Sequence, residues 1–221
     1  GASSGIGLEI CKYLASKKHN LILTARNEKK LKDISAELSD SFKIKCDYIS
    51  CDLSMIESPK EIYDYCKSKK YNVNVLVNNA GFALPNSFEK TPMEDEERFL
   101  RVLSTSVISL TKIFINDMIQ NKALNLSYNN IGITCTALCP GYTVTNFHTA
   151  SGVQDEMDRV PKFLKKSAKR IAIEGVDGML KGKKIVVPTK TWKVIVFLLK
   201  IVPKSVFDFL SSIMAPGRYD N

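Results

Sequence analysis

Histidine and tryptophan are scarce in this sequence, whose 221 residues include two histidines and one tryptophan. Six cysteines are present, but no two are spaced as C-x-x-C and no histidine cluster accompanies them. Because a structural zinc site needs close sets of such ligands, we expect no metal site. Most of the cysteines lie in apolar stretches, so we interpret them as small buried residues in a reducing compartment; they are Cys11, Cys46, Cys51, Cys66, Cys135 and Cys139.

Long apolar runs and one-sided charge clusters are also absent. The longest apolar run, Val194 to Leu199, is far shorter than the roughly 20 residues of a membrane-spanning helix, and no signal-peptide pattern is visible. We therefore expect a cytoplasmic protein. The net charge is +9, but basic residues alternate with acidic ones, as in NEKKLKDISAEL. This pattern argues against a nucleic-acid partner and fits a phosphorylated cofactor or an anionic membrane surface better.

Strand-like stretches alternate with helix-like stretches along the chain. Residues 5–17 favour a helix, and then follow NLILTA, the charged helix NEKKLKDISAEL, KIKCDYISCDL, the helix PKEIYDYCKSKK and VNVLVNNAG. Later, IGITCTALCPG and KKIVVP are expected to be strands on either side of the helix SAKRIAIEGVDGML. Alternation of this kind predicts an α/β fold with a parallel sheet. An apolar helical extension, interrupted at Pro203, is expected over about residues 189–214.

Two places interrupt this alternation. The glycine-rich stretch GASSGIG begins at Gly1, although such a loop needs a preceding strand to aim its backbone at a pyrophosphate. We therefore interpret the first strand as absent. Apolar helical periodicity also runs from Met93 to about Tyr128 without a Gly or Pro to stop it, which predicts an unusually long helix. Its length indicates that two helices are joined near Lys122 and Ala123 and that the strand between them is missing.

Four motifs carry a family resemblance: GASSGIG from Gly1, CDL from Cys51, NNAG from Asn78 and CPGYTVT from Cys139. In this order and at these spacings they resemble the short-chain dehydrogenase/reductases, in the branch near the 3-oxoacyl and 17-beta-hydroxysteroid reductases. The resemblance implies a Rossmann-like, doubly wound parallel sheet and a single NAD(P)-binding domain over residues 1–221. It also implies an oxidoreductase that works on a carbonyl or the matching alcohol, as a homo-oligomer.

The resemblance assigns a cofactor contact to each motif. Glycines at the start of a helix let backbone N–H groups approach a phosphate at the positive end of the helix dipole. At the end of NLILTA, Ala25 supplies no carboxylate for a ribose hydroxyl and Arg26 supplies a charge for a 2′-phosphate, so NADP(H) is expected. A solvated surface arginine at Arg26 and an N-cap role for Asp52 remain alternatives. The expected cofactor-binding residues are Gly1, Ser3, Ser4, Gly5, Ile6, Gly7, Arg26, Asp52, Leu53, Asn79, Ala80, Gly81, Pro140, Gly141, Thr143 and Thr145.

The family's catalytic Tyr-x-x-x-Lys pair lies on a later helix than any such pair in this sequence. Tyr13 is six residues beyond Gly7, which places it about 9 Å along a helix from the phosphate end. We therefore expect structural roles for all three pairs with this spacing, with Tyr13 packing on the sheet; the pairs are Tyr13 with Lys17, Tyr63 with Lys67, and Tyr65 with Lys69. The catalytic residues are expected in the missing region, and Leu103 takes the place of a family asparagine that helps a proton-relay water.

Two functions follow from these observations. The first is an NADP(H)-dependent carbonyl reductase or alcohol dehydrogenase whose working form has residues that this sequence omits. The second is a degenerate, non-catalytic relative that binds a nucleotide or a partner. We favour the first, because the loss of two central strands would expose the core of a chain that folds.

The substrate is expected to be lipophilic, such as a fatty 3-oxoacyl chain or a steroid-like ketone. The segment between Thr145 and Ser167 follows the expected nicotinamide contact, and we interpret it as a lid. The apolar C-terminal stretch has Trp192, Lys193 and Lys200 near its edges, which suits peripheral contact with an anionic membrane. Ordinary core packing or packing between subunits fits the same stretch.

Overall fold

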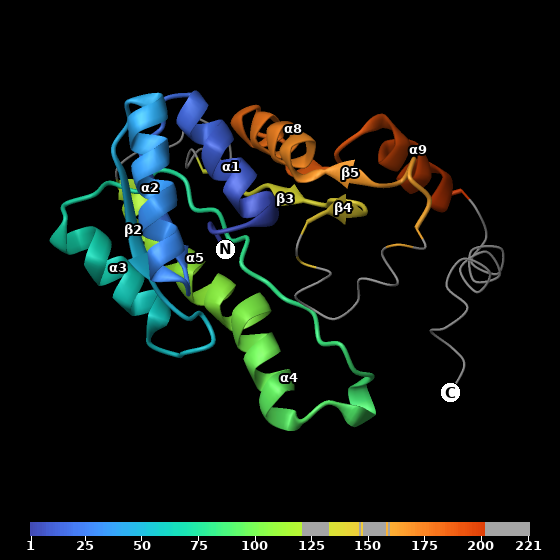
Figure 1. Cartoon of the computed structure of the whole chain (residues 1–221), viewed down its shortest axis with the longest axis horizontal. Coiled ribbons are helices and arrows are strands. Elements are labelled where there is room, and N and C mark those ends of the chain that lie inside the picture. Colours follow the sequence, from blue (N-terminus) through green and yellow to red (C-terminus); the bar gives the residue numbers. More distant parts are fainter. Residues whose placement is uncertain (121–132, 146, 148–157, 159, 202–221) are drawn as a thin grey trace.

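The structure, a computed structural model, describes residues 1–120, 133–145, 147, 158 and 160–201. The predicted alternation is confirmed through α3 and again at α8, β6 and α9 (Figure 1). In chain order the elements are α1 (Gly5–Ser16), β1 (Leu21–Ala25), α2 (Glu28–Phe42), β2 (Cys46–Ser50), α3 (Ser58–Ser68), a 3-10 helix (Phe88–Lys90), α4 (Met93–Leu100), a π-helix (Arg101–Thr105), α5 (Ser106–Gln120), β3 (Ala137–Leu138), β4 (Thr143–Val144), β5 (Lys166–Ser167), α8 (Ala168–Leu180), β6 (Ile185–Val186) and α9 (Lys190–Leu199).

Helices cover both faces of the parallel pair β1–β2. The two strands pair in register from Leu21 opposite Cys46 to Ala25 opposite Ser50. Leu23 packs in a cluster with side chains of α1 and α2, whereas its neighbour Ile22 packs against a cluster from α3 and α5. Successive side chains of a strand point to opposite faces, so each strand contributes to two separate cores. This arrangement confirms the predicted α/β class with a doubly wound parallel sheet.

A second group of elements lies beside this pair. Helix α8 packs along α1, where Ile10 and Leu14 meet Ala172 and Val176. Under α8, β3 pairs in parallel with β6, and β4 pairs in parallel with β5. The helix lies close to β6, since a Cβ at Gly178 would be 2.3 Å from a methyl group of Val186. In Figure 1 β3, β4 and β5 lie to the right of β2, below α8 and α9.

The prediction of a strand at VNVLVNNAG is wrong. Within the described residues the strands form three separate pairs, and the segment 71–84 contributes a strand to none of them. A strand needs a neighbouring strand to pair with, and the pairs among the described strands are β1 with β2, β3 with β6 and β4 with β5. Its apolar pattern is used in another way, because Val73 and Leu76 pack on the α3–α5 cluster. In IGITCTALCPG, likewise, only Ala137 and Leu138 form a strand in the portion that the structure describes.

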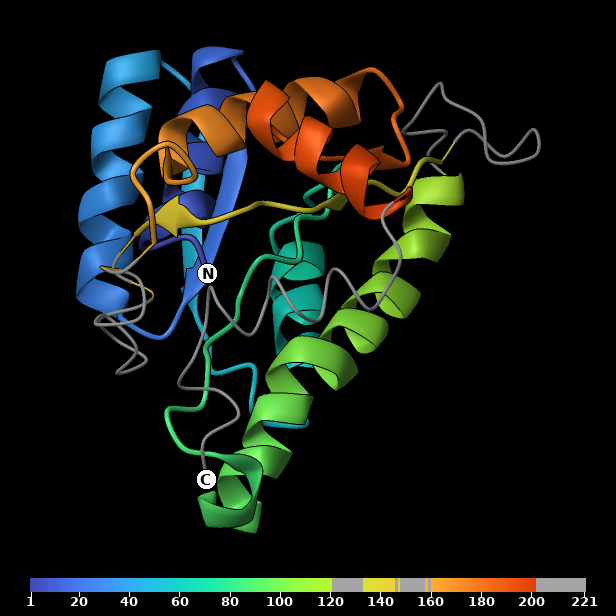
Figure 2. The same ribbon diagram turned by 90° about the vertical axis from the view of Figure 1, so that its right-hand side faces the viewer.

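The predicted long helix is confirmed as far as Gln120. Helix α4, the π-helix and α5 form one continuous run, which is the green rod in Figure 2. Its inner face is buried at every fourth position, as expected for a helix that packs on a core; these residues are Val102, Ser106, Leu110, Phe114 and Met118. By length and composition alone this run, Met93–Gln120, could cross a membrane, a test that core helices of soluble proteins also pass. The expected junction at Lys122 lies outside the described residues.

The C-terminal region presents an apolar helix to the surface. Helix α9 has no buried residue, and Phe197 and Ile201 are 61% and 65% exposed. The second predicted apolar helix, after Pro203, and most of the expected lid lie outside the described residues.

The cysteine prediction holds for four of the six residues. Cys51 and Cys66 are buried, and Cys11 and Cys46 are partly buried. Burial raises the pKa of the Cys11 thiol to about 12, so this thiol stays protonated. The prediction is wrong for Cys135 and Cys139, which are exposed, because the stretch that carries them forms only two residues of strand.

Candidate cofactor-binding site

The glycine-rich loop is tied to the carboxyl end of β1. The backbone nitrogens of Gly1 and Ala2 donate hydrogen bonds to the carbonyl oxygen of Thr24, at 2.7 and 3.0 Å. Ser4 is the N-cap of α1 and makes no side-chain capping hydrogen bond. The helix then begins at Gly5, whose φ of +57° is the left-handed region that glycine adopts without strain. The loop thus places the N-terminus of α1, with its free N–H groups, at the end of the strand pair.

The NNAG turn packs directly on this loop. The Asn79 amide donates a hydrogen bond to the carbonyl oxygen of Gly1 at 3.3 Å. A Cβ at Gly7 would be 2.1 Å from that same oxygen, and a Cβ at Gly1 would be 2.9 Å from the backbone of Ala80. Two motifs that are nearly 80 residues apart therefore meet at van der Waals distance, and glycine is required at both contact points.

A small cavity of about 240 Å³ lies at the carboxyl ends of β1 and β2. Its walls come from the glycine loop, Arg26 after β1, Asp52 and Leu53 after β2, the NNAG turn and Arg98 of α4. Asp52 accepts two hydrogen bonds from Ser54, one from the backbone nitrogen at 3.0 Å and one from the hydroxyl at 2.9 Å. Asp52 therefore closes a local turn, while the N-cap of α3 is Glu57.

The charge of Asp52 is stabilised within this cavity. Partial burial opposes ionisation of the carboxyl group. The hydrogen bonds from Ser54 and the guanidinium groups of Arg26 and Arg98 outweigh that effect, and the pKa of Asp52 lies below its ordinary value. At neutral pH one carboxylate thus interacts with two guanidinium groups, which come from different elements.

A larger cavity of about 1600 Å³ adjoins the first and extends to the CPGYTVT segment. This segment reaches the glycine loop, because a Cβ at Gly5 would be 3.4 Å from the Thr145 side chain. On the other side the Trp192 ring lies against Gly141, where a Cβ would be 1.9 Å from the indole. The Trp192 ring nitrogen donates to the Leu164 carbonyl oxygen at 3.1 Å, which fixes the ring at this end of the cavity.

The structure brings the sequence-predicted residues together. All of the predicted cofactor-binding residues except Gly7 line one of the two cavities, and Gly7 supports the loop from behind. Further residues also line the larger cavity and were not predicted from the sequence; among them are the charged residues Lys30 and Arg98 and the aromatic residue Trp192. Neither Lys30 nor Arg98 lies in a recognisable motif. The stretch that carries Trp192 suits either membrane contact or ordinary packing, and the contact of Trp192 with Gly141 is a packing contact within the chain.

The three early Tyr-x-x-x-Lys pairs contact other elements and line neither cavity. The Tyr13 hydroxyl donates to Asp177 of α8 at 2.7 Å, so Tyr13 packs on α8 and not on the sheet as predicted. The Tyr63 hydroxyl and the Lys67 ammonium both contact Asp117 of α5, at 3.3 and 2.9 Å. These two pairs join helices to one another, whereas Tyr65 of the third pair interacts with Asp47 of β2.

Leu103 lies beside the NNAG turn. It belongs to the π-helix, and a Cβ at Gly81 would be 2.9 Å from its side chain. This side chain therefore faces the NNAG turn. A leucine at this position has no group that could hold a water molecule.

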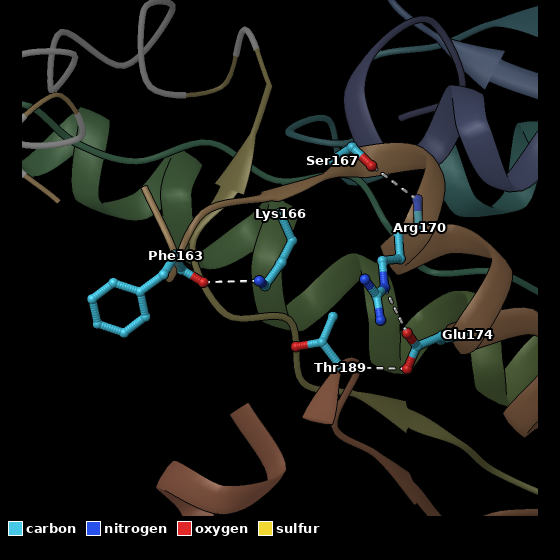
Figure 3. Close-up of polar contacts among 6 residues, drawn as sticks. All are labelled: Phe163, Lys166, Ser167, Arg170, Glu174 and Thr189. Atoms are coloured by element: carbon cyan, nitrogen blue, oxygen red, sulfur yellow. Dashed lines mark hydrogen bonds and ion pairs between the residues drawn. The ribbon is translucent and has the colours of Figure 1, made fainter. Parts of the chain in front are cut away.

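Polar contacts between α8 and α9 hold the Trp192 end of the site (Figure 3). One Glu174 carboxylate oxygen accepts from the Thr189 backbone nitrogen at 2.7 Å, and the other accepts from Arg170 at 3.1 Å. Thr189 is the N-cap of α9 and has a φ of 68° and a ψ of 145°, a backbone region that glycine normally occupies. Glu174 thus holds a strained junction, three residues before Trp192.

The comparison with known proteins identifies the family. Residues 1–126, more than half of the chain, match the family model described as short chain dehydrogenase. The chain belongs to the short chain dehydrogenase family. The resemblance seen in the four motifs is therefore confirmed.

Individual relatives in this family cover different shares of the chain. The very-long-chain 3-oxoacyl-CoA reductase of Candida glabrata is 34% identical over 117 residues, which are 51% of this chain and 33% of the relative. A human relative named inactive hydroxysteroid dehydrogenase-like protein 1 is 30% identical over 127 residues, which are 55% of this chain and 37% of the relative. The chain spans about a third of the length of these two curated relatives.

A solved structure supports the fold. The short-chain dehydrogenase from Sphingobium yanoikuyae, determined in complex with NADPH, superposes with a TM-score of 0.78 and 19% identity, covering 94% of this chain and 93% of that one. At this identity the likeness shows the shared fold.

Proposed function

We propose that this chain forms the NADP(H)-binding part of an oxidoreductase that reduces a lipophilic carbonyl compound or oxidises the matching alcohol. The supporting observation is the convergence of four motifs, spread over about 145 residues, around two adjoining cavities. Membership of the short chain dehydrogenase family supports an oxidoreductase. The NADPH in the structure of the Sphingobium relative supports the choice of cofactor.

The residues of the chain fit a dinucleotide in an extended pose. The N-terminus of α1 and the glycine loop suit a pyrophosphate, because the first N–H groups of a helix have no partner within the helix and the helix dipole favours an anion. Arg26 suits a 2′-phosphate at the small cavity, and the segment from Pro140 to Thr145 suits the nicotinamide end. When bound, the nicotinamide supplies or accepts the hydride of the reaction. Trp192 fills the space beside Gly141 at that end.

The reaction needs a group that transfers a proton. None of the three Tyr-x-x-x-Lys pairs lines either of the described cavities. A non-catalytic nucleotide-binding protein is therefore the second candidate function. It is favoured by Leu103 beside the NNAG turn and by a relative whose name calls it inactive. NADPH binding without turnover of any ketone would support this second candidate.

Calorimetric titration with NADPH and with NADH tests the cofactor assignment. We expect the unmodified chain to bind NADPH at least about tenfold more tightly, since a phosphate–guanidinium contact contributes a charge-assisted hydrogen bond. Arg26→Ala should remove most of this preference. Lys29→Ala is the matched control, because Lys29 is exposed on α2 and lines neither cavity. Equal affinity of the unmodified chain for both cofactors would contradict NADP(H) specificity.

The substrate class is tested by turnover. The larger cavity has Tyr142, Phe147 and Trp192 at its nicotinamide end, and apolar walls suit a lipophilic ketone. The Candida relative's name, a 3-oxoacyl-CoA reductase, supports a fatty acyl substrate. We expect long-chain 3-oxoacyl and steroid ketones to react faster with NADPH than small polar ketones. The opposite order would contradict the lipophilic substrate.

Peripheral membrane contact through α9 is a separate part of the proposal. Exposed apolar side chains of α9 are accompanied by Lys190, Lys193 and Lys200, a combination that binds anionic lipid surfaces. We expect co-sedimentation with anionic but not neutral vesicles, and its loss in the double variant Phe197→Ser and Leu198→Ser. Ile108→Ser on α5 serves as the control, since Ile108 is also an exposed apolar residue. If the double variant instead abolishes a homo-oligomer in solution, α9 packs between subunits.

A further inference from the structure

The small cavity carries more positive charge than the motif residues provide. Arg26 comes from the end of β1, and Arg98 comes from the second turn of α4, more than 70 residues later in the sequence. Both guanidinium groups lie near the Asp52 carboxylate, which is also part of the wall. No sequence motif contains Arg98, so its place in the wall is known from the fold alone.

Arg98 is available to bind a ligand. Its side chain is 50% exposed, and its ion pair, with Asp95 at 3.4 Å, joins two exposed residues one turn apart on α4. Exposed pairs of this kind contribute little to stability and are readily exchanged for a stronger partner. In the described part of the chain the Arg26 guanidinium takes part in none of the ion pairs.

The balance of charge in the wall requires both arginines. A phosphate monoester brings close to two negative charges at neutral pH. The Asp52 carboxylate repels it and offsets one of the two guanidinium groups. With Arg26 alone the wall would have no net positive charge, whereas Arg26 and Arg98 together leave one positive charge facing the phosphate.

We propose that Arg98 is a second specificity-determining residue, which holds the 2′-phosphate of the adenosine together with Arg26. This inference rests on the proposed NADP(H) binding and deepens it. The two side chains come from different elements, α4 and the β1 end, and both line the small cavity, so a phosphate bound there can contact both. Two guanidinium groups also select the 2′-phosphorylated nucleotide over one that carries a free hydroxyl.

Calorimetric titration with two small probes tests this role without any turnover. Adenosine 2′,5′-bisphosphate carries the 2′-phosphate, and adenosine 5′-monophosphate lacks it. We expect Arg98→Ala to weaken binding of the bisphosphate about tenfold and to leave binding of the monophosphate within about twofold. Arg98→Lys should recover part of the loss, because it keeps the charge without the bidentate geometry.

Arg101→Ala is the matched control. Arg101 follows on the same helical run, forms a similar pair with Glu97 at 3.5 Å and lines neither cavity. The Arg101→Ala variant should bind both probes as the unmodified chain does. Circular dichroism should show native helix content in every variant. If Arg98→Ala keeps the full preference for the bisphosphate, or weakens both probes equally, the assignment of Arg98 is wrong while Arg26 can still act alone. If the unmodified chain binds neither probe, nucleotide binding itself fails, and the role of Arg98 fails with it.

Discussion

At the scale of single residues, Gly7 has almost no room for a side chain beside the glycine loop and the NNAG turn. A Cβ there would be 2.1 Å from the Gly1 oxygen and 2.5 Å from the Asn79 amide nitrogen. We expect Gly7→Ala to cost about 1–3 kcal/mol of stability, since both neighbours are held in the loop and must shift. The same variant should weaken NADPH binding at least about tenfold, because the displaced glycine loop would no longer fit the cofactor. A tenfold change in affinity corresponds to about 1.4 kcal/mol of binding free energy.

The control for this variant is Gly182→Ala. Gly182 has a φ of 67° and follows α8, away from both cavities. It should lose about 1 kcal/mol through backbone strain alone and keep its affinity for NADPH. Denaturant unfolding and calorimetry on the same samples measure the two quantities. Unchanged NADPH affinity in Gly7→Ala would show that the glycine loop does not contact the cofactor.

Tyr13 tests the interpretation of the early Tyr-x-x-x-Lys pairs. Its hydroxyl donates to the Asp177 carboxylate at 2.7 Å across the α1–α8 contact. We expect Tyr13→Phe to lower the free energy of unfolding by about 1 kcal/mol and to leave cofactor affinity and any turnover unchanged. Tyr48→Phe is a suitable control, since no described residue accepts from that hydroxyl. A large loss of turnover with normal stability would instead place Tyr13 in the catalytic machinery.

At the scale of elements, the junction between α8 and α9 should respond to pH through Glu174. Burial raises the pKa of Glu174, but the hydrogen bonds from Thr189 and Arg170 outweigh it, so the folded-state pKa lies below the ordinary value of about 4.3. The stabilising contact is therefore present above that value and is lost as pH falls through the lowered folded-state pKa. We expect the amide protection of Lys193, whose nitrogen bonds to the Thr189 oxygen, to fall below about pH 4.

Hydrogen exchange, corrected for its intrinsic pH dependence, measures this change. In Glu174→Gln the protection should be lower at neutral pH and independent of pH between about 3 and 5, since the amide does not titrate there. Glu97→Gln is the control, because Glu97 forms an exposed pair on α4. Loss of protection with an identical pH profile in Glu174→Gln would show that other groups control the junction.

The helices were predictable from the sequence because their signals are local. Asn27 caps α2 by accepting a hydrogen bond from the Lys30 nitrogen, and Ser167 caps α8 by accepting one from Arg170. Apolar periodicity then defines the buried face over the next three turns. These signals lie within a few residues of the element that they specify, so the predicted and observed helices agree.

The strands after β2 were not predictable in the same way. A stretch such as VNVLVNNAG has the composition of a buried strand, but strand formation depends on a partner from elsewhere in the chain. In the candidate site, too, some residues could be predicted from local sequence and others could not. The glycine loop, Arg26 and Asp52 stand next to a recognisable motif or strand end, whereas Arg98 and Trp192 reach the cavities through tertiary packing. Sequence spacing holds no signal for that packing.

At the scale of the whole molecule, cofactor binding should be visible as stabilisation. NADPH at about 100 times its Kd would stabilise the folded state by about 2.7 kcal/mol. For a chain of this size that corresponds to a rise in Tm of roughly 5–10 °C. Differential scanning calorimetry with NADPH and with NADH, at equal concentration, should give the larger rise for NADPH. Identical melting curves with and without NADPH would contradict binding to the folded chain.

The contact between Trp192 and Gly141 also gives the molecule a built-in optical reporter. Because the sequence contains one tryptophan, all indole fluorescence comes from this one ring at the end of the larger cavity. The reduced nicotinamide absorbs in the range where indole emits, so a complete reduced dinucleotide should quench the emission by energy transfer. A ligand that carries only the adenosine half should leave it nearly unchanged. One spectrum can therefore tell which half of a ligand is bound.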